Sequence, residues 1–354
     1  MATKKTGTKI KDLFDLVGKE GASDLFISAG APPTLRVNGE LLLTPYDKLT
    51  PEQSKELVYS FLTKEQRIRF ETTKELDFSL AVGRKHRFRV NVYYQRQAVT
   101  AALRPIPEDI PSLTELGLPE DMAKLAEARQ GLLLVTGPTG HGKTTTQASL
   151  IDLINNTRAC HVITVEDPIE YIHFHKHSIV DQREVGADTH SFPDALKYVL
   201  RQSPDVILIG EMRDLETIQA ALRAAETGHL VLATLHTNDA IQTVDRIIDV
   251  FPAEQQQQVR FQVSMTLLAI ISQRLLPRED GEGRILAYEF LKNTTAIANL
   301  IREGKTHQVY SVLETATKEG MTTLDRNIKG LYMQGLISYD EAIAHVRNPK
   351  EIMT

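Results

Sequence analysis

The sequence predicts an α/β protein of two domains, a small α+β domain followed by a larger domain built on a doubly wound parallel sheet. Two observations lead to this prediction. In the C-terminal two thirds of the chain, short continuous apolar runs alternate with segments whose apolar residues recur at helical spacing. Upstream of them, positions 104–120 contain four prolines, which cannot lie inside a helix or a central strand and therefore mark a linker. A chain of 354 residues is long enough for about two domains.

The composition is that of a soluble globular protein, 42% hydrophobic and 25% charged. The net charge of -5 argues against a nucleic-acid partner held by bulk electrostatics. Cys160 is the only cysteine, so one chain can form neither a disulfide nor a cysteine-based zinc site. The apolar runs are far shorter than the roughly 20 residues that span a bilayer, and no secretory signal is present. We therefore expect a cytoplasmic protein with no direct membrane span.

The first domain, residues 1–105, is expected to mix helices with antiparallel strands. Apolar residues at helical spacing predict a helix over Ile10–Lys19, and Thr50 with Pro51 marks the start of another. Between Lys85 and Pro107, apolar and polar residues alternate, which predicts an exposed pair of antiparallel strands. The Asn38-Gly39 pair is a hairpin signal. Three further strands are predicted at Ser23–Ile27, Pro33–Val37 and Leu76–Val82.

The linker is placed at residues 106–120 and the second domain at residues 121–354. Strands that are buried on both faces of a parallel sheet read as continuous apolar runs. Four runs fit this description: Leu132–Thr136, Val162–Val165, Val206–Ile209 and Leu230–Thr234. Helices are predicted between and after them at 143–156, 192–202, 213–226, Ala253–Leu276, Thr323–Gln334 and Tyr339–Val346. Ser338 and Glu341 have the spacing of a capping box for the last of these helices.

The loop after the first of these strands carries the strongest motif. The sequence GPTGHGKT matches G-x-x-x-x-G-K-[ST], in which glycines let backbone N–H groups surround a β-phosphate at the start of a helix. Lys143 is expected to reach the β- and γ-phosphates of ATP, and the Thr144 hydroxyl to hold Mg²⁺. The expected nucleotide-binding residues are Gly137, Pro138, Thr139, Gly140, His141, Gly142, Lys143, Thr144 and Thr145.

Ionisable residues follow the other three strands, and in a doubly wound sheet ligands bind at the carboxyl ends of the strands. The second strand ends in Glu166, with Glu170 just beyond, and the third leads to Glu211. The fourth leads to His236 and has His229 at its other end. ATP hydrolysis needs a carboxylate that orients or deprotonates water. Glu211 is the first candidate and Glu166 and Glu170 the next. His236 either senses the γ-phosphate or caps its strand, and His229 is a further catalytic candidate.

Phosphoryl transfer also needs cations at the transition state, often an arginine from a neighbouring subunit. Arg89, Arg96 and Arg104 lie before the linker and are the candidates. Arg89 also belongs to a basic cluster of a kind that can bind nucleic acid. No nucleic-acid-binding fold is evident around it, and a solvated or inter-subunit face is the preferred interpretation. The cluster consists of Arg84, Lys85, Arg87 and Arg89.

The sequence HFHKH places His173, His175 and His177 on one face if the segment is an extended strand. Three histidines on one face would suit a metal ion. An exposed polar strand face is the preferred interpretation.

Taken together, four motifs resemble those of the type II/IV secretion ATPase family, and most closely its type IV pilus retraction members. GPTGHGKTTT is similar to the family's Walker A motif and ITVEDPIE to its Asp box. DVILIGEMRD resembles its Walker B motif and GHLVLATLHTNDA its His box. SDLFISAGAPPTLRVNGEL is similar to the start of the family's PAS-like domain, and AIANLIREGKTHQ to a segment associated with retraction.

The resemblance implies a PAS-like N-terminal domain, then a RecA-like ATPase domain with C-terminal helices. It also implies a homohexameric ring, peripheral at the cytoplasmic face of the inner membrane. ATP hydrolysis with Mg²⁺ would there turn a platform protein of that membrane and depolymerise type IV pili, which supports twitching motility. An active site completed from N-terminal domains and neighbouring subunits would agree with the three arginine candidates.

The chain departs from the family pattern at a few positions. His141 stands where serine is usual, Ala298 where arginine is common and Phe26 where histidine is common. The His141 side chain is expected to point away from the phosphates. Gly210 occupies the place of the Walker B aspartate of many other P-loop ATPases, which leaves Glu211 as the main acid.

The main alternative is a pilus extension or type II secretion ATPase. Those relatives usually carry an extra N-terminal domain and a tetracysteine zinc motif, so the single cysteine and the short N-terminal domain argue against them. A GTP-driven switch would need an N-K-x-D motif, which is missing. A nucleic-acid translocase would need a basic stripe or an aromatic stacking platform, and neither is evident.

Overall fold

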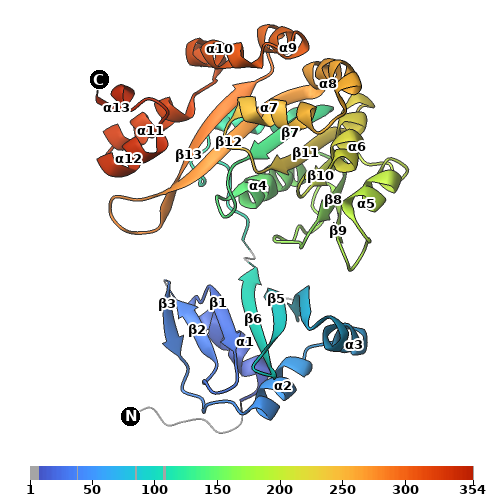
Figure 1. The fold of residues 1–354 in the computed structure, drawn as a ribbon, viewed down its shortest axis with the longest axis vertical. Helices are drawn as coiled ribbons and strands as arrows, with labels where there is room; N and C mark the ends of the chain where they lie inside the picture. The colour runs from blue at the N-terminus through green and yellow to red at the C-terminus, as the bar shows by residue number, and fades with distance from the viewer. Residues whose placement is uncertain (1–7, 38, 84–85, 107–108, 354) are drawn as a thin grey trace. The chain divides into compact units, whose positions relative to one another are not determined.

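Figure 1 shows the computed structural model of the chain, in which residues 8–37, 39–83, 86–106 and 109–353 are described. The chain forms two compact units. The first comprises Met1–Asp109 and the short segment Pro168–Ile172, and the second comprises Ile110–Asp167 and His173–Thr354. Each unit has its own hydrophobic core, so each is described by itself.

The first unit is built on a six-stranded antiparallel sheet in the order β3-β2-β1-β6-β5-β4. Apolar residues of all three of its helices enter one core with the central strands, among them Phe14, Val58 and Phe70. The elements are α1 (Ile10–Glu20), β1 (Asp24–Ile27), β2 (Thr34–Val37), β3 (Glu40–Leu43), α2 (Pro51–Tyr59), α3 (Lys64–Thr73), β4 (Glu75–Val82), β5 (His86–Gln95) and β6 (Ala98–Ile106).

The predicted helices and strands of this unit are confirmed, and Thr50 caps α2 by accepting a hydrogen bond from the Gln53 N–H. The sequence did not predict β3 or α3. The expectation of an exposed strand pair was wrong for β6, which is central and mostly buried because it pairs with both β1 and β5. Asn38 lies outside the described residues, as do Arg84 and Lys85 of the basic cluster.

The start of the linker also differs from the expectation. Pro105 lies within β6, paired with Phe88 of β5. It is tolerated there because β1 pairs with β6 only as far as Leu103, so the other edge of β6 needs no donor at Pro105. Between Asp109 and Pro119 the structure has turns and no helix or strand.

The second unit contains a seven-stranded sheet in the order β13-β12-β7-β11-β10-β8-β9. The strands are parallel except β13, which runs antiparallel to β12. All four predicted strands are confirmed, and they are the adjacent strands β7, β11, β10 and β8. The sheet consists of β7 (Gly131–Thr136), β8 (His161–Glu166), β9 (Ile179–Glu184), β10 (Val206–Ile209), β11 (Leu230–Leu235), β12 (Leu267–Pro277) and β13 (Arg284–Lys292).

Helices cover both faces of this sheet, as the doubly wound prediction requires (Figure 1). One face packs on η1 and α4 through residues such as Met122 and Ile154, and the other on α5 to α9 through residues such as Leu222 and Ile247. These helices are η1 (Glu120–Glu127), α4 (Lys143–Thr157), α5 (Phe192–Val199), α6 (Leu215–Glu226), α7 (Ala240–Asp249), α8 (Ala253–Thr266) and α9 (Thr295–Arg302).

The long helix predicted over Ala253–Leu276 was wrong in its second half. Helix α8 ends at Thr266, and the following residues form β12 between β7 and β13. The run from Leu267 to Leu276 is apolar enough for a helix or a buried strand. It becomes a strand because pairing with two neighbours satisfies its backbone while its side chains enter the core.

Helices α11 to α13 pack on β12 and β13 in a small separate core, whereas α10 and η3 join the core of the sheet face that packs on α5 to α9. Thr323 caps α11. Of the capping box predicted for α12, one half is found: the Ser338 hydroxyl accepts from the Glu341 N–H. The elements are η2 (Thr306–Gln308), α10 (Val309–Thr315), η3 (Ala316–Glu319), α11 (Leu324–Met333), α12 (Tyr339–His345) and α13 (Lys350–Met353). Across the described part of the chain, no helix has both the length and the apolar character needed to cross a bilayer.

Candidate active site

The loop between β7 and α4 is shaped by its glycines. Gly137 has φ 141°, and a Cβ atom there would lie 2.3 Å from the Gln273 carbonyl oxygen of β12, so only glycine fits. Gly142 caps α4 in the left-handed conformation, with φ 80°. The chain thereby turns from the sheet into the helix with the first N–H groups of α4 pointing back to the loop. This is the strand–loop–helix context that the motif predicts.

Lys143 lies at the start of α4 with its ammonium group over this loop. Its Nζ donates to the carbonyl oxygens of Gly137 at 2.8 Å and Pro138 at 2.9 Å. The side chain is buried, so the charge is held in a low-dielectric position next to the N-terminus of α4. Thr144 and Thr145 follow in the first turn of α4 and are partly exposed.

Strand β12 lies against the other side of the loop. The buried Gln273 side chain donates from Nε2 to the His141 carbonyl oxygen at 2.8 Å and accepts from the Thr146 hydroxyl at 3.0 Å. The Leu275 N–H donates to His141 Nδ1 at 2.9 Å, so the His141 ring faces β12, and Arg284 of β13 donates to the Gly140 carbonyl. Gln273 was not predicted as a site residue, because its segment reads as a helix and matches no motif.

The ends of β11 and β10 bring His236 and Glu211 to the loop. His236 Nδ1 lies 3.4 Å from Lys143 Nζ and 3.3 Å from the Thr139 hydroxyl. Because the lysine can only donate, we assign the ring proton to Nε2, which lies 3.5 Å from Glu211 Oε2. The other Glu211 oxygen pairs with Arg213 Nε at 2.7 Å. Lysine, histidine and carboxylate thus form one chain of contacts from the loop to β10.

Glu166 lies at the same edge, at the end of β8. Its carboxylate is buried and accepts from the Thr164 hydroxyl at 2.6 Å and from Gln182 Nε2 at 3.0 Å. Gly210 follows β10 beside it. A Cβ atom at Gly210 would approach the Val165 carbonyl to 3.3 Å and Glu166 Cα to 3.4 Å. The tight approach of β8 and β10 therefore favours glycine where other P-loop ATPases carry aspartate.

Two of the predicted catalytic residues do not join this cluster. His229 precedes β11 at the amino edge of the sheet, where its ring contacts the Ala224 carbonyl at 3.0 Å and the Thr227 hydroxyl at 3.3 Å. Six residues of strand separate it from the end that leads to His236, so the structure does not bring His229 to the loop. Glu170 lies in the irregular segment after β8 that groups with the first unit.

The three arginine candidates belong to the first unit. Arg104 pairs with Asp24 at 3.0 Å, and Arg89 is its exposed neighbour across β5 and β6. Arg96 is in the hairpin turn between these strands, with φ 49°, just beyond the end of β5. Their approach to the loop stays a prediction.

The three histidines of HFHKH do not line one strand face, because residues 173–177 form no strand. His173 is buried, and burial lowers the pKa of its ring to about 4. His175 Nδ1 accepts from the Val180 N–H. Among the described residues, no three or more His, Cys, Asp and Glu side chains lie together in a way that suits a metal ion.

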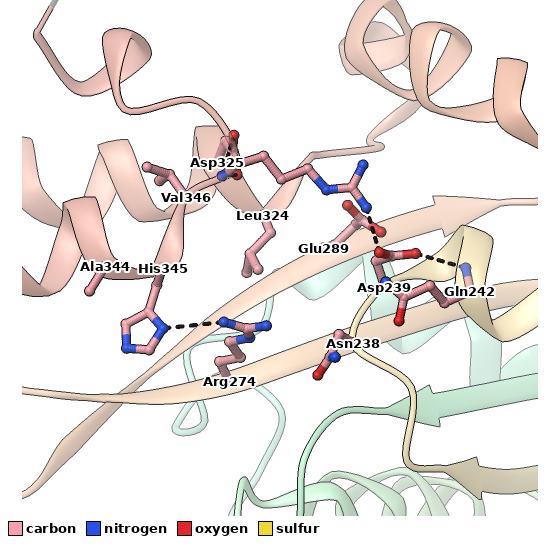
Figure 2. A pocket seen from close by; sticks show the side chains of 11 residues that line it. Asn238, Asp239, Gln242, Arg274, Glu289, Leu324, Asp325, Ala344, His345 and Val346 are labelled. Atoms are coloured by element: carbon pink, nitrogen blue, oxygen red, sulfur yellow. Dashed lines mark hydrogen bonds and ion pairs between the residues drawn. The ribbon is translucent and has the colours of Figure 1, made fainter.

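A hollow of about 270 Å³ lies among the residues that follow His236, strands β12 and β13, and the C-terminal helices (Figure 2). Asp239 caps α7 there by accepting from the Gln242 N–H, and it also pairs with Arg347. The Glu289 carboxylate accepts from the Ala240 N–H at 2.9 Å, and burial raises its pKa to about 7. The Asp239–Arg347 pair attaches the C-terminal segment to the N-cap of α7, three residues beyond His236.

Comparison with known proteins agrees with this geometry. The family model described as "Type II/IV secretion system protein" matches residues 19–344. The type IV pilus retractation ATPase PilT of Pseudomonas aeruginosa is 47% identical over 96% of this chain and 99% of its own length. The type IV pilus ATPase PilU of the same organism is 45% identical over 97% of this chain and 90% of its own. The crystal structure of the pilus retraction motor PilT with bound ADP superposes with TM-score 0.92 and 51% identity, covering 98% and 99% of the two chains.

Proposed function

Since this chain belongs to the type II/IV secretion system protein family, we propose that it is an ATPase motor that retracts type IV pili. The observation that carries the proposal is the chain of contacts from Lys143 through His236 to Glu211, next to a glycine loop at the start of α4. This arrangement suits a nucleotide phosphate on one side and an attacking water on the other. The similarity to a retraction ATPase over nearly the whole length of the chain supports retraction, and not extension, as the action of the motor.

The loop and α4 bind the phosphates of ATP. Backbone N–H groups of residues 139–145 surround the β-phosphate, and Lys143 moves from the loop carbonyls to the β- and γ-phosphate oxygens. The Thr144 hydroxyl and the carboxylates at the strand ends are the oxygen ligands that Mg²⁺ prefers, so the donor set fits this ion. When bound, Mg²⁺ neutralises charge that develops on the phosphates.

Glu211 orients and deprotonates the water that attacks the γ-phosphate. It is the first candidate because His236 connects it to the loop lysine. The His236 ring, placed between Lys143 and Glu211, senses whether the γ-phosphate is present. Glu166 holds the Thr164 and Gln182 side chains in place at the sheet edge. His229 and Glu170 act on the site of a neighbouring subunit.

The working assembly is a homohexameric ring at the cytoplasmic face of the inner membrane. In each chain the first unit is PAS-like, in keeping with a six-stranded antiparallel sheet and its helices. The second unit is RecA-like, in keeping with its mainly parallel sheet. Arg89, Arg96 and Arg104 supply transition-state charge from the N-terminal units. Cycles of hydrolysis turn an inner-membrane platform protein and draw pilin subunits out of the fibre.

Deleting the gene for this chain is expected to increase the number of surface pili per cell and to abolish twitching, because fibres are extended but not withdrawn. Pili are counted by electron microscopy in the deletion strain, with and without restored expression. Cells without pili would instead identify an extension ATPase. Unchanged pilus numbers and unchanged twitching would contradict the proposal.

A further inference from the structure

The feature of interest is the His141 ring, which lies inside the phosphate loop and contacts β12. Strand β12 is longer than its neighbour β7, and their pairing ends at Ser272 and Thr136. Beyond that point the edge of β12 faces the loop, so its N–H groups need partners other than β7. The Leu275 N–H finds one in His141 Nδ1, at 2.9 Å.

This contact fixes the protonation state of the ring. Since Leu275 donates, Nδ1 carries a lone pair and the ring is neutral with its proton on Nε2. The charged and titratable groups around the ring come from each neighbouring element: Lys143 of α4, Arg274 of β12, Arg284 of β13 and His345 of α12. Burial, then these neighbours, lower the pKa of His141, so the acceptor form prevails at neutral pH.

The same residue is fixed a second time through its backbone. The Gln273 side chain donates to the His141 carbonyl and accepts from Thr146, so one buried amide ties the loop to α4. The ring and the backbone carbonyl of His141 therefore each make a hydrogen bond to β12, and together these two bonds attach the loop to the strand. Loop N–H groups bind phosphate well only when they are already held in a converging arrangement.

We propose that His141 is a positioning residue for the phosphate loop: its neutral ring anchors the loop to β12, and protonation of the ring releases that anchor. A protonated ring presents an N–H to the Leu275 N–H, so attraction becomes repulsion. Nucleotide affinity then falls in acid. The inference rests on the proposed function, since it requires that this loop binds nucleotide.

The test compares His141→Asn, His141→Ala and the unchanged full-length protein. Asparagine Oδ1 lies two bonds from Cβ, as histidine Nδ1 does, so His141→Asn keeps an acceptor that does not titrate. The dissociation constant of fluorescent ADP is measured from pH 5 to pH 8, with and without Mg²⁺. Circular dichroism at each pH checks that the proteins remain folded.

At pH 8 the unchanged protein and His141→Asn are expected to bind ADP alike, and His141→Ala to bind roughly tenfold more weakly, the equivalent of one hydrogen bond. The sign of the pH effect follows from the lowered pKa of His141. Above that pKa the ring is neutral and the unchanged protein has its full affinity for ADP, and the affinity is lost as the pH falls through the pKa. In acid, the ADP affinity of the unchanged protein should fall towards that of His141→Ala, while His141→Asn should still bind ADP more tightly than His141→Ala. Equal affinity of all three at pH 8, or parallel pH profiles of the unchanged protein and His141→Asn, would overturn the inference.

Amide exchange at Leu275 gives a second readout that does not depend on nucleotide. It is expected to be faster in His141→Ala than in His141→Asn, and equal rates would overturn the anchor. Failure of the unchanged protein to bind ADP at any pH would refute the proposed function instead, and the exchange rates would still decide whether the anchor exists.

Discussion

Replacing Lys143 by alanine is expected to weaken ATP binding roughly 100-fold and to abolish turnover. The ammonium group is buried beside the loop, within hydrogen-bonding distance of two loop carbonyls and of His236. Alanine removes both the charge that the phosphates need and the contact between the loop and His236. Isothermal titration with ATP and a phosphate-release assay measure the two effects.

The matched control is Lys124→Ala. Lys124 is exposed and pairs with Asp121 in the same unit, so this variant has the same change in net charge without touching the loop. It should bind and hydrolyse ATP like the unchanged protein. Normal ATPase activity of Lys143→Ala would refute the assignment of the loop.

Glu211→Gln is expected to bind ATP with nearly unchanged affinity while its turnover falls roughly 100- to 10,000-fold. Glutamine keeps the size of the side chain, but it cannot accept the proton of the attacking water. The measurement is kcat from phosphate release together with the dissociation constant for ATP.

Glu166→Gln and Glu216→Gln serve as comparisons for Glu211→Gln. Glu166 is the second candidate at the same sheet edge, and Glu216 lies in the first turn of α6. Glu216→Gln should be active. Unchanged kcat in Glu211→Gln with a large loss in Glu166→Gln would transfer the water-activating role to Glu166.

The parts of the fold that were predictable from sequence are those with a strong local pattern. Strands β7, β8, β10 and β11 are continuous apolar runs, and the glycine loop or an ionisable residue lies at the carboxyl end of each. Strand β12 was missed because residues 253–276 contain no glycine or proline, so nothing local ends the helix at Thr266. Its pairing with β7 and β13 decides its conformation, and that pairing is non-local.

The site shows the same division. The loop, Glu166, Glu211 and His236 were predicted from motif and strand order, and the structure places them at one edge. Gln273 acts on the loop from 132 residues away, and Arg347 reaches Asp239 from 108 residues away. Such contacts leave no periodicity in a single sequence. His229 lies at the other edge of the sheet because the whole length of β11 separates it from His236.

The most direct measurement of the central claim, that ATP hydrolysis at this loop drives pilus retraction, is live imaging of labelled pili. A deletion strain is supplied with the unchanged protein or with Glu211→Gln at matched expression. Frequent retraction events are predicted with the unchanged protein, and loss of those events with Glu211→Gln although the fibres still form. Equal retraction frequencies in the two strains would contradict the claim.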